Sequence, residues 1–298
     1  MVTSTETLTT RAPSPARSRR TVTRIGFAGI LLRLLVWGVL LTTALLVIVP
    51  LGWMLMSSLK VNQEFLADPF GLPTTLFWQN YADAWNLGVG QYMWNSVTVT
   101  VASIIATTLI SAWAAFGLTK LTIPFSRPVL FLIVGGMMLA PTVALIPLLR
   151  LLQSLGIYDS LLGITILYTA FRIPFITFLI RSYMVDLPHE VDEAALLDGC
   201  SRSQQFWRLT LPMSVPIIVS AVILQCLFAW NEYLFAFIFI SSTENMTLPV
   251  GLANLASKLS TNYPMIFAGM TLASIPMIVA FFAAQRFFVR GLAEGIGK

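Results

Sequence analysis

The sequence predicts an all-α, polytopic membrane protein that crosses the bilayer six times, with both termini in the cytoplasm. Apolar residues make up 57% of the 298 residues and charged residues only 10%, whereas a soluble domain carries about 25% charged residues. The mean hydropathy of +0.81 indicates the same class. Uncharged windows recur along the chain, and each reaches the roughly 20 residues that a helix needs to cross a bilayer.

Six apolar segments are long enough to be transmembrane helices. Four of them contain no charged residue, the fourth along the chain contains Arg172, and the fifth contains Glu232. The expected spans are Leu34–Met56, Trp94–Gly117, Val129–Leu149, Leu161–Ile180, Pro216–Ile240 and Met265–Gln285. We expect the first span to be retained, because its apolar run is longer than the roughly 7–15 residues of a signal-peptide core.

The distribution of positive charge sets the expected orientation. With a cytoplasmic N-terminus, 14 Lys and Arg residues lie in cytoplasmic segments and 3 in outer loops, as the positive-inside rule requires. This asymmetry accounts for the net charge of +5 without nucleic acid as a partner. Residues 1–33, rich in Thr, Ser, Pro and Arg, are expected to form a disordered basic tail that attracts anionic lipid of the bilayer. Residues 34–298 are the expected transmembrane domain.

The cytoplasmic loop between the fourth and fifth spans, residues 182–212, is much longer than a simple connection. A proline suited to the first turn of a helix is followed by acidic residues that favour a helix N-terminus. A glycine then supplies a C-terminal stop, and a Ser-x-x-Gln pair predicts a second short helix. These residues are Pro188, then Glu190, Asp192 and Glu193, then Gly199, and finally Ser201 with Gln204.

The first of these short helices has the character of a docking element. Its small residues Ala194 and Ala195 let another backbone approach closely, and Glu193 offers a carboxylate to an arginine of a partner. The alternative is a helix that rests on the bilayer surface, but such helices favour Lys and Arg on their polar face. The acidic character of this helix therefore favours a protein partner.

The same loop resembles the EAA motif of ABC importer permeases, through Glu193-Ala194-Ala195, Asp198-Gly199, Leu211-Pro212 and Pro216. From about residue 35 to its end, the chain is similar to the six-span permease of maltose-type carbohydrate importers. The similar stretches include Asn80-Tyr81, Asn95-Ser96-Val97, Ala115-Phe116-Gly117-Leu118, Ile146-Pro147-Leu148, Leu155-Gly156-Ile157 and Trp230-Asn231-Glu232-Tyr233. The resemblance implies the type I ABC importer permease fold.

The resemblance also implies roles and partners. The EAA segment is then a coupling helix that docks into a cleft on a separate ATPase, where Glu193 pairs with a basic residue. Gly199 allows the turn after this helix, and Asp198 helps to hold the two short helices together. Cys200 stands where alanine is more frequent in the family, and Asp192 where glutamate is common. The implied partners are a dimer of ATP-binding cassette ATPases that holds ATP and Mg, a second homologous permease, and an extracytoplasmic solute-binding protein.

The C-terminal tail, residues 286–298, resembles a family segment that reaches between the two ATPase subunits. Arg290, Gly291 and Leu292 are the expected ATPase contacts, and a frayed chain end is the alternative. The glycines of this tail do not form a phosphate-binding loop, which requires Gly-x-x-x-x-Gly-Lys-[Ser/Thr] between a strand and a helix. Energy is therefore expected from another subunit.

Two groups of polar residues within the spans are candidates for the translocation pathway. Arg172 is expected near the midplane of the fourth span, where a charge usually faces a cavity or a partner, and snorkelling toward the cytoplasm is the alternative. The tetrapeptide Trp230-Asn231-Glu232-Tyr233 combines aromatic surface with an amide and a carboxylate, a mixture suited to sugars. An interfacial aromatic anchor or a contact between subunits are the alternatives for this tetrapeptide.

The sequence also excludes several kinds of chemistry. His189 is the only histidine, so a zinc-type motif cannot form, and the two cysteines Cys200 and Cys226 exclude a disulfide scaffold. We therefore expect a non-catalytic permease of a bacterial plasma-membrane importer for a sugar or sugar-like solute, with a glycerol phosphate or a polyol as alternatives. A secondary transporter remains open, although it would usually carry paired ionisable groups near the midplane. An intramembrane enzyme is a further alternative, but this sequence shows no nucleophile–base pair for such an enzyme.

Overall fold

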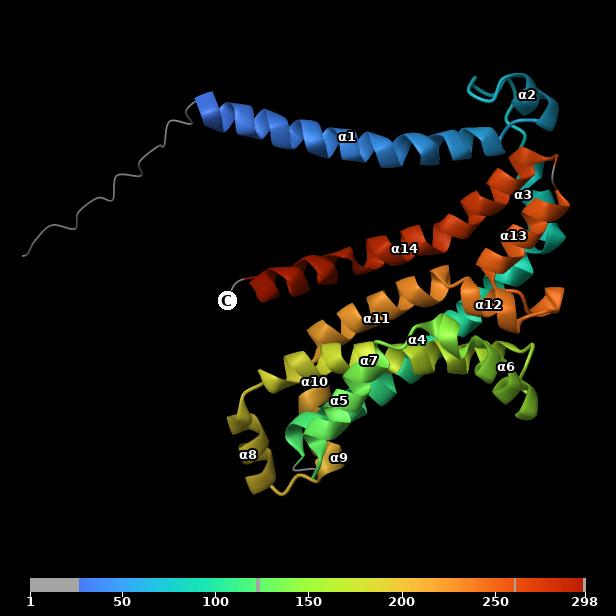
Figure 1. The fold of residues 1–298 in the computed structure, drawn as a ribbon. Coiled ribbons are helices and arrows are strands. Elements are labelled where there is room, and N and C mark those ends of the chain that lie inside the picture. The colour runs from blue at the N-terminus through green and yellow to red at the C-terminus, as the bar shows by residue number, and fades with distance from the viewer. Residues whose placement is uncertain (1–26, 122–123, 260, 297–298) are drawn as a thin grey trace, which may run out of the picture. The chain divides into compact units, whose positions relative to one another are not determined.

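The computed structural model describes residues 27–121, 124–259 and 261–296, and the regular elements in these ranges are helices (Figure 1). The chain divides into two compact units, residues 1–51 and 52–298. The described part of the first unit belongs to α1 (Phe27–Ser58), which begins seven residues before the expected boundary at Leu34. Its side chains from Leu31 to Leu51 are exposed, as suits an apolar helix whose surroundings are lipid or another subunit. Residues 1–26 of the expected tail lie outside the described residues.

The second unit contains the remaining elements. In chain order they are α2 (Asn62–Ala67), α3 (Gln79–Ala84), the π-helical turn η1 (Trp85–Val89), α4 (Gly90–Lys120), α5 (Ser126–Gly136), the 3-10 turn η2 (Pro141–Ala144), α6 (Leu145–Ser154), α7 (Leu161–Val185), α8 (His189–Leu197), α9 (Arg202–Gln205), the π-helical turn η3 (Phe206–Thr210), α10 (Leu211–Met213), α11 (Val215–Asn231), α12 (Leu234–Phe239), the 3-10 turn η4 (Thr243–Asn245), α13 (Leu248–Lys258) and α14 (Tyr263–Ile296).

The described helices account for four to six membrane spans. Four helical segments are long and apolar enough to cross a bilayer by themselves, and the number rises to six if each of two bent helix pairs counts as one span. The four segments are Leu31–Ser58, Gln79–Lys120, Leu161–Val185 and Tyr263–Ala283. The prediction of an all-α polytopic protein is confirmed, but two of the predicted spans are not straight helices.

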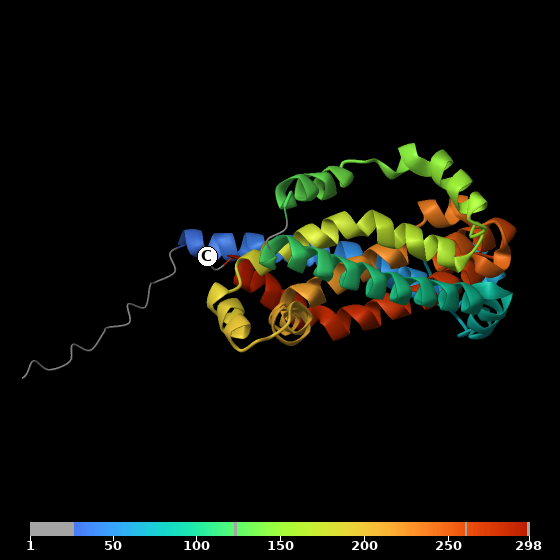
Figure 2. The same cartoon turned by 90° about the horizontal axis from the view of Figure 1, so that it is seen from below.

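The third predicted span, Val129–Leu149, is broken. α5 ends at Gly136, and the helical segment that starts at Pro141 is turned by 89° relative to α5. Two adjacent glycines weaken the end of α5, and Ala140 takes an extended conformation because the residue before a proline avoids helical angles. Figure 2 shows α5 and α6 lying along one side of α7.

The fifth predicted span, Pro216–Ile240, is also interrupted. α11 ends at Asn231, Glu232 has an extended conformation, and the short α12 starts at Leu234. The 17 residues of α11 span about 26 Å at 1.5 Å per residue. The break arises because the Glu232 side chain binds the N–H groups at the start of α12, which ends one helix and begins another.

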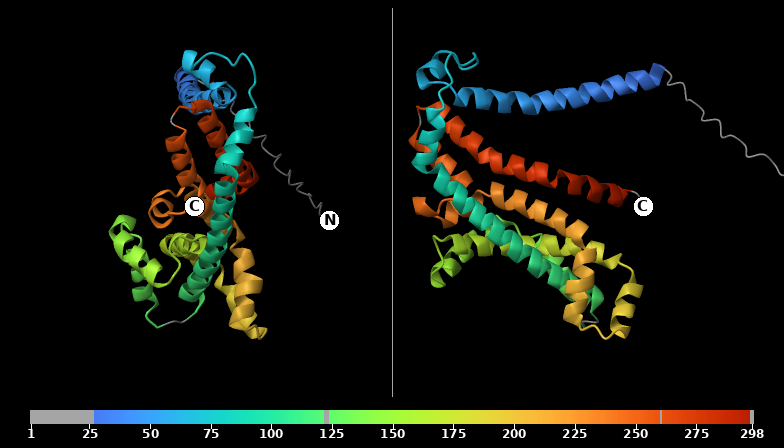
Figure 3. Two further views of the ribbon diagram at one scale, coloured as in Figure 1. Left: turned by 90° about the vertical axis from the view of Figure 1, so that its right-hand side faces the viewer. Right: turned by 180° about the vertical axis from the view of Figure 1, so that it is seen from behind.

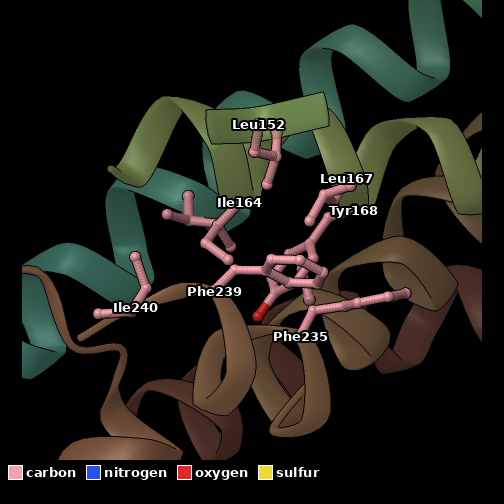
Figure 4. Close-up of a cluster of buried hydrophobic side chains, with 9 residues drawn as sticks. Leu152, Ile164, Leu167, Tyr168, Phe235, Phe239 and Ile240 are labelled. Carbon is pink, nitrogen blue, oxygen red and sulfur yellow. The ribbon is translucent and has the colours of Figure 1, made fainter. Parts of the chain in front are cut away.

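The core of the second unit is built on α4, α7 and α11. Buried residues of α4 that face α7 and α11 are mostly small, as is usual where transmembrane helices pack closely; they include Ser103, Thr107, Ser111, Ala112 and Ala115. A second part of the core joins α6 and α7 to α12, with Tyr168 at its centre between Leu152, Phe235 and Phe239 (Figure 4).

The second unit has two distinct ends. α8 and α9 lie at one end, whereas α6, α12 and α13 lie at the other (Figure 1, Figure 3). We call these the α8 end and the α13 end. The long helices α4, α7 and α11 run between them, so they connect the two candidate sites that follow.

Candidate functional site

The loop at the α8 end folds as the sequence predicts. Pro188 occupies the position before the first residue of α8, and Glu190 and Asp192 lie in the first turn of that helix. The second short helix, α9, starts after Ser201 with a complete capping box. In that box, the Gln204 N–H donates to Ser201 Oγ at 3.3 Å, and the Ser201 N–H donates to Gln204 Oε1 at 2.8 Å.

Gly199 makes the turn between α8 and α9. Its φ angle of 76° lies in the left-handed region, which side chains with a Cβ rarely adopt. The N–H of Cys200 bonds to the carbonyl of Ala195 at 3.0 Å, and the N–H of Gly199 bonds to that of Leu196 at 3.1 Å. This pair of bonds is the Schellman motif that ends many helices, so the glycine role expected from the sequence has a geometric basis here.

The exposed face of α8 combines a carboxylate with apolar surface. Glu193 and Ala194 are exposed, and Leu197 is 89% exposed. Glu193 and Leu197 lie one turn apart on the same side of the helix. Ala195 is buried, so of the two alanines only Ala194 belongs to the accessible face. An exposed leucine beside a carboxylate is suited to docking against a protein surface.

The two short helices are joined by Asp192 and not by the expected Asp198. The Gln205 amide on α9 donates to Asp192 Oδ1 at 3.0 Å, whereas Asp198 is exposed at the end of α8. Asp192 Oδ2 also lies 2.7 Å from Lys120 Nζ, at the last residue of α4. Lys120 and Gln205 could not be identified from the sequence, because nothing in their local sequence places them beside α8.

Arg172 lies near the middle of α7 and is held by residues of α7 and α11. Its Nε donates to Gln225 Oε1 at 3.3 Å, and the Gln225 amide reaches Ser103 Oγ of α4 at 3.4 Å. The guanidinium lies 4.7 Å from the ring centroids of both Phe175 and Phe228, within the range of cation–π attraction. Arg172 therefore ties α7 to α11, and Gln225 extends this link to α4.

The tetrapeptide from Trp230 to Tyr233 lies at the α13 end, where its members face different surroundings. Trp230 is buried and lines, with Asn231, a cavity of about 340 Å³ between α11, α13 and α14. Tyr233 lines a second cavity of about 350 Å³ between α12 and α13 and stacks on Phe237. Arg172 lines neither cavity, so the structure does not join all the candidate pathway residues into one site.

Glu232 has a structural task at the break between α11 and α12. Its Oε1 accepts the N–H of Phe235 at 2.8 Å, and its Oε2 accepts the N–H of Ala236 at 3.2 Å. These are free donors at the start of a helix, which a carboxylate satisfies well. The sugar contact that the sequence suggested for Glu232 would compete with this role.

Asp159, in the connection between α6 and α7, organises the α13 end. Its carboxylate accepts the N–H groups of Ser241 and Ser242 at 2.9 and 3.1 Å, and Asn245 donates to its backbone carbonyl. Burial raises the pKa of Asp159, but the hydrogen bonds from Ser242 and Ser241 lower it by more, so the net pKa lies below the ordinary value. Nothing in the local sequence of Asp159 indicates this role.

Two further sequence predictions concern the C-terminal tail and metal binding. α14 continues as a helix to Ile296, but the side chains of Arg290 and Leu292, and the surroundings of Gly291, lie outside the described residues. Within the ranges that the structure describes, three or more His, Cys, Asp or Glu side chains nowhere gather in a metal-binding arrangement.

Comparison with known proteins assigns the chain to a family. Residues 107–294 match the sequence model of a protein family described as the binding-protein-dependent transport system inner membrane component. The chain belongs to this family. The permease is 41% identical over 263 residues to the probable ABC transporter permease protein YurM of Bacillus subtilis (strain 168), with 88% of each chain covered. It is 32% identical over 259 residues to the diacetylchitobiose uptake system permease protein NgcG of Streptomyces coelicolor, with 86% of each covered.

A solved structure has the same fold. The permease resembles a chain of a bacterial ABC transporter involved in the import of the acidic polysaccharide alginate, with a TM-score of 0.77 and 22% identity. The match covers 88% of the permease and 98% of that chain. The permease is accordingly a multi-pass component of the inner membrane, with the ABC importer permease fold and a transport role that involves no catalysis of its own.

Proposed function

We propose that the permease forms one half of the translocation pathway of an ATP-driven importer for a sugar or sugar-like solute, and that α8 is its coupling helix. A dimer of ATP-binding cassette ATPases, which holds ATP and Mg, binds the α8 end. A second homologous permease completes the pathway. The cycle alternates between states open to opposite sides of the membrane, and closure of the ATPase dimer drives the change through α8.

The exposed face of α8 is the observation that carries this proposal. Glu193 is exposed and carries a carboxylate suited to a basic residue of the ATPase, while Leu197 is 89% exposed and carries an apolar contact. The Gly199 turn and the Ser201 capping box fix how α8 is presented. A short helix with such a rigid base moves as one body when a partner pushes on it.

The excess of Lys and Arg on one side supports a cytoplasmic α8 end and cytoplasmic termini. The α13 end is then extracytoplasmic. The solute-binding protein delivers its solute to the loops there, which include residues 57–93 and 241–264. Both regions carry helices of their own, α2, α3 and α13, so they present ordered surfaces.

The solute class rests on two kinds of support. NgcG serves diacetylchitobiose uptake, and the transporter with the similar fold imports alginate, so both handle chains of sugar units. The cavity beside Trp230 and Asn231 offers an aromatic ring and an amide, the mixture that binds sugar faces and hydroxyls. A polyol or a glycerol phosphate carries the same hydroxyls and is the alternative solute.

The first test is affinity purification of the tagged permease from its native membrane, with the co-purifying chains identified by mass spectrometry. A cytoplasmic ATPase and a second permease are the expected partners. Recovery of the permease alone, with solute uptake into vesicles that needs an ion gradient and no ATP, would replace the importer by a secondary transporter.

The second test addresses α8. Glu193→Arg places a positive charge against the basic residue of the ATPase and is expected to abolish uptake and solute-stimulated ATP hydrolysis, with normal insertion in the membrane. Normal uptake by Glu193→Arg would remove Glu193 from the coupling role.

A further inference from the structure

One ion pair ties a transmembrane helix to the two short helices at the α8 end. Lys120 is the last residue of α4, and its Nζ lies 2.7 Å from Asp192 Oδ2 on α8. The same Nζ lies 3.4 Å from the carbonyl of Leu187, in the segment that leads into α8. Lys120 therefore holds two points of the α8 region, although α4 is far from α8 in the sequence.

Asp192 extends this contact to α9. Its other oxygen, Oδ1, accepts the Gln205 amide at 3.0 Å, and Gln205 Oε1 accepts from Arg202 at 3.0 Å. Gln205 is completely buried. The next residue, Phe206, is also completely buried and packs its ring against Trp113 and Phe116 of α4. α4 thus meets α8 through charges at its end, and it meets the first residue of η3 through aromatic contacts.

The pair is poorly explained by stability alone. The side chain of Lys120 is 2% exposed and that of Asp192 is 18% exposed. Taking two such charges out of water consumes most of the energy that their attraction returns, so apolar residues of similar size stabilise a protein about as well. An ion pair with hydrogen bonds differs from apolar packing because it fixes the position and direction of the groups that it joins.

Chain connections alone link α8 to only two of the long helices. α8 follows α7 directly, and through α9, η3 and α10 it leads to α11. α4 has no direct chain connection to α8 and packs along α7 and α11. A displacement of α8 reaches α4 directly only where the two touch, and the Lys120–Asp192 pair is such a point.

We propose that Lys120, Asp192 and Gln205 form a brace that transmits the movement of α8 to α4. This inference rests on the proposed coupling role of α8 and names the residues that make α4 move with it. Lys120 and Asp192 are positioning residues: Lys120 is too buried to reach the ATPase, and Asp192 uses both oxygens within the permease. When ATP binding moves α8, the brace pulls the end of α4, and the three long helices reorient together.

The brace is tested by removing its charges together. Lys120→Met with Asp192→Asn leaves no buried unpaired charge, and the introduced asparagine keeps an oxygen for the Gln205 amide. The complete importer carrying this double variant is reconstituted in vesicles with solute-loaded binding protein, and the solute imported per ATP hydrolysed is measured. The ratio is expected to fall by about 2- to 30-fold, the range found for residues that couple two sites, with normal co-purification of the ATPase.

Two comparison variants show whether the charges themselves carry the effect. Lys120→Arg keeps the charge and is expected to retain the wild-type ratio. Lys120→Met alone leaves the carboxylate of Asp192, which is 18% exposed and keeps the Gln205 amide, and is expected to lower the ratio even if the double variant does not fold. A wild-type ratio in Lys120→Met and in the double variant overturns the brace.

The outcome is also distinct from a failure of the proposed function. If the wild-type permease does not bind an ATPase, or if Glu193→Arg imports normally, α8 is not a coupling helix. If those two tests succeed but the double variant loses the ATPase itself, the pair positions α8 for docking, and the transmission that we propose is wrong.

Discussion

The carboxylate of Glu232 accepts the N–H of Phe235, with 2.8 Å between Oε1 and N. The second oxygen accepts the N–H of Ala236, so one side chain satisfies two donors at the start of α12. A carboxylate inside a membrane usually faces a cavity or a partner, and here the partner is the backbone of the same chain. Glu232, which the sequence suggested as a solute ligand, therefore caps the start of α12.

We expect Glu232→Ala to destabilise the permease by about 1 kcal/mol, the usual contribution of a helix cap, and Glu232→Gln to destabilise it less. Gln keeps one oxygen for the Phe235 N–H. Thermal unfolding of the purified wild type, Glu232→Gln and Glu232→Ala proteins measures the order of their stabilities. The affinity of the importer for its solute should be unchanged in Glu232→Gln, and a large loss of affinity without a loss of stability would restore the role of Glu232 as a solute ligand.

Substitutions at Gly199 test whether backbone strain in the turn after α8 lowers solute uptake. A Cβ at Gly199 meets nothing within 4 Å, so Gly199→Ala acts only through the left-handed φ of 76° and should be less stable by roughly 1–2 kcal/mol. Asn tolerates this conformation better, so Gly199→Asn should be milder. Solute uptake should therefore fall more in Gly199→Ala than in Gly199→Asn.

Gly156 supplies the control for that series. It has a φ of 67° and open space around its Cβ position, but it lies between α6 and α7, away from α8. Gly156→Ala should lower the unfolding temperature by a similar amount and leave the solute imported per ATP unchanged. An equal loss of coupling in both variants would mean that reduced stability, and not the orientation of α8, explains the result for Gly199.

Asp159 predicts a pH dependence at the α13 end. Its pKa is lowered in the folded protein because hydrogen bonds from Ser242 and Ser241 outweigh the effect of burial. The ionised carboxylate therefore adds stability above the ordinary pKa of about 4, and this contribution is lost as the pH falls through the folded-state pKa.

Asp159→Asn should mimic the protonated state. Asn also accepts the left-handed backbone of residue 159, whose φ is 54°. The difference in unfolding temperature between the wild type and Asp159→Asn should be largest near about pH 7 and should vanish below the folded-state pKa. A difference that stays constant down to about pH 3 would assign the stabilisation to another group.

Arg172 and Gln225 should behave as a coupled pair. Arg172→Lys loses the fixed guanidinium that bonds Gln225 Oε1 and lies over two phenylalanine rings. Gln225→Leu should then destabilise the Arg172→Lys protein less than the wild type, by about 0.6 kcal/mol, the average for polar pairs in membranes. A double-mutant cycle from unfolding experiments measures this difference. Additive effects would mean that Arg172 has another main partner, such as the solute or the second permease.

The α8 region was largely predictable from the sequence because its signals are local. The acidic first turn, Gly199 and the Ser201–Gln204 pair act on backbone groups within a few residues of themselves, and each has the predicted position. Pro188 lies one residue before α8 and not in its first turn. The long spans were predictable for a similar reason, since hydrocarbon thickness and composition alone set their length.

The breaks in the third and fifth spans show where local signals were outweighed. Gly135, Gly136 and Pro141 disfavour a continuous helix, but they lie inside a long uncharged window. In the fifth span, Glu232 was interpreted as a possible ligand because its alternative role depends on a bend that only the folded chain contains.

The sequence by itself determined that this protein is an all-α permease with two short helices between its fourth and fifth spans. Only the tertiary structure decided that Lys120 meets Asp192, that Asp159 binds Ser242, and that Arg172 is tied to Gln225. The physical reason is the distance along the chain. Helix ends and turns are set by neighbours in sequence, whereas the partner of a buried charge is whichever side chain the packing of distant helices brings within a few ångströms.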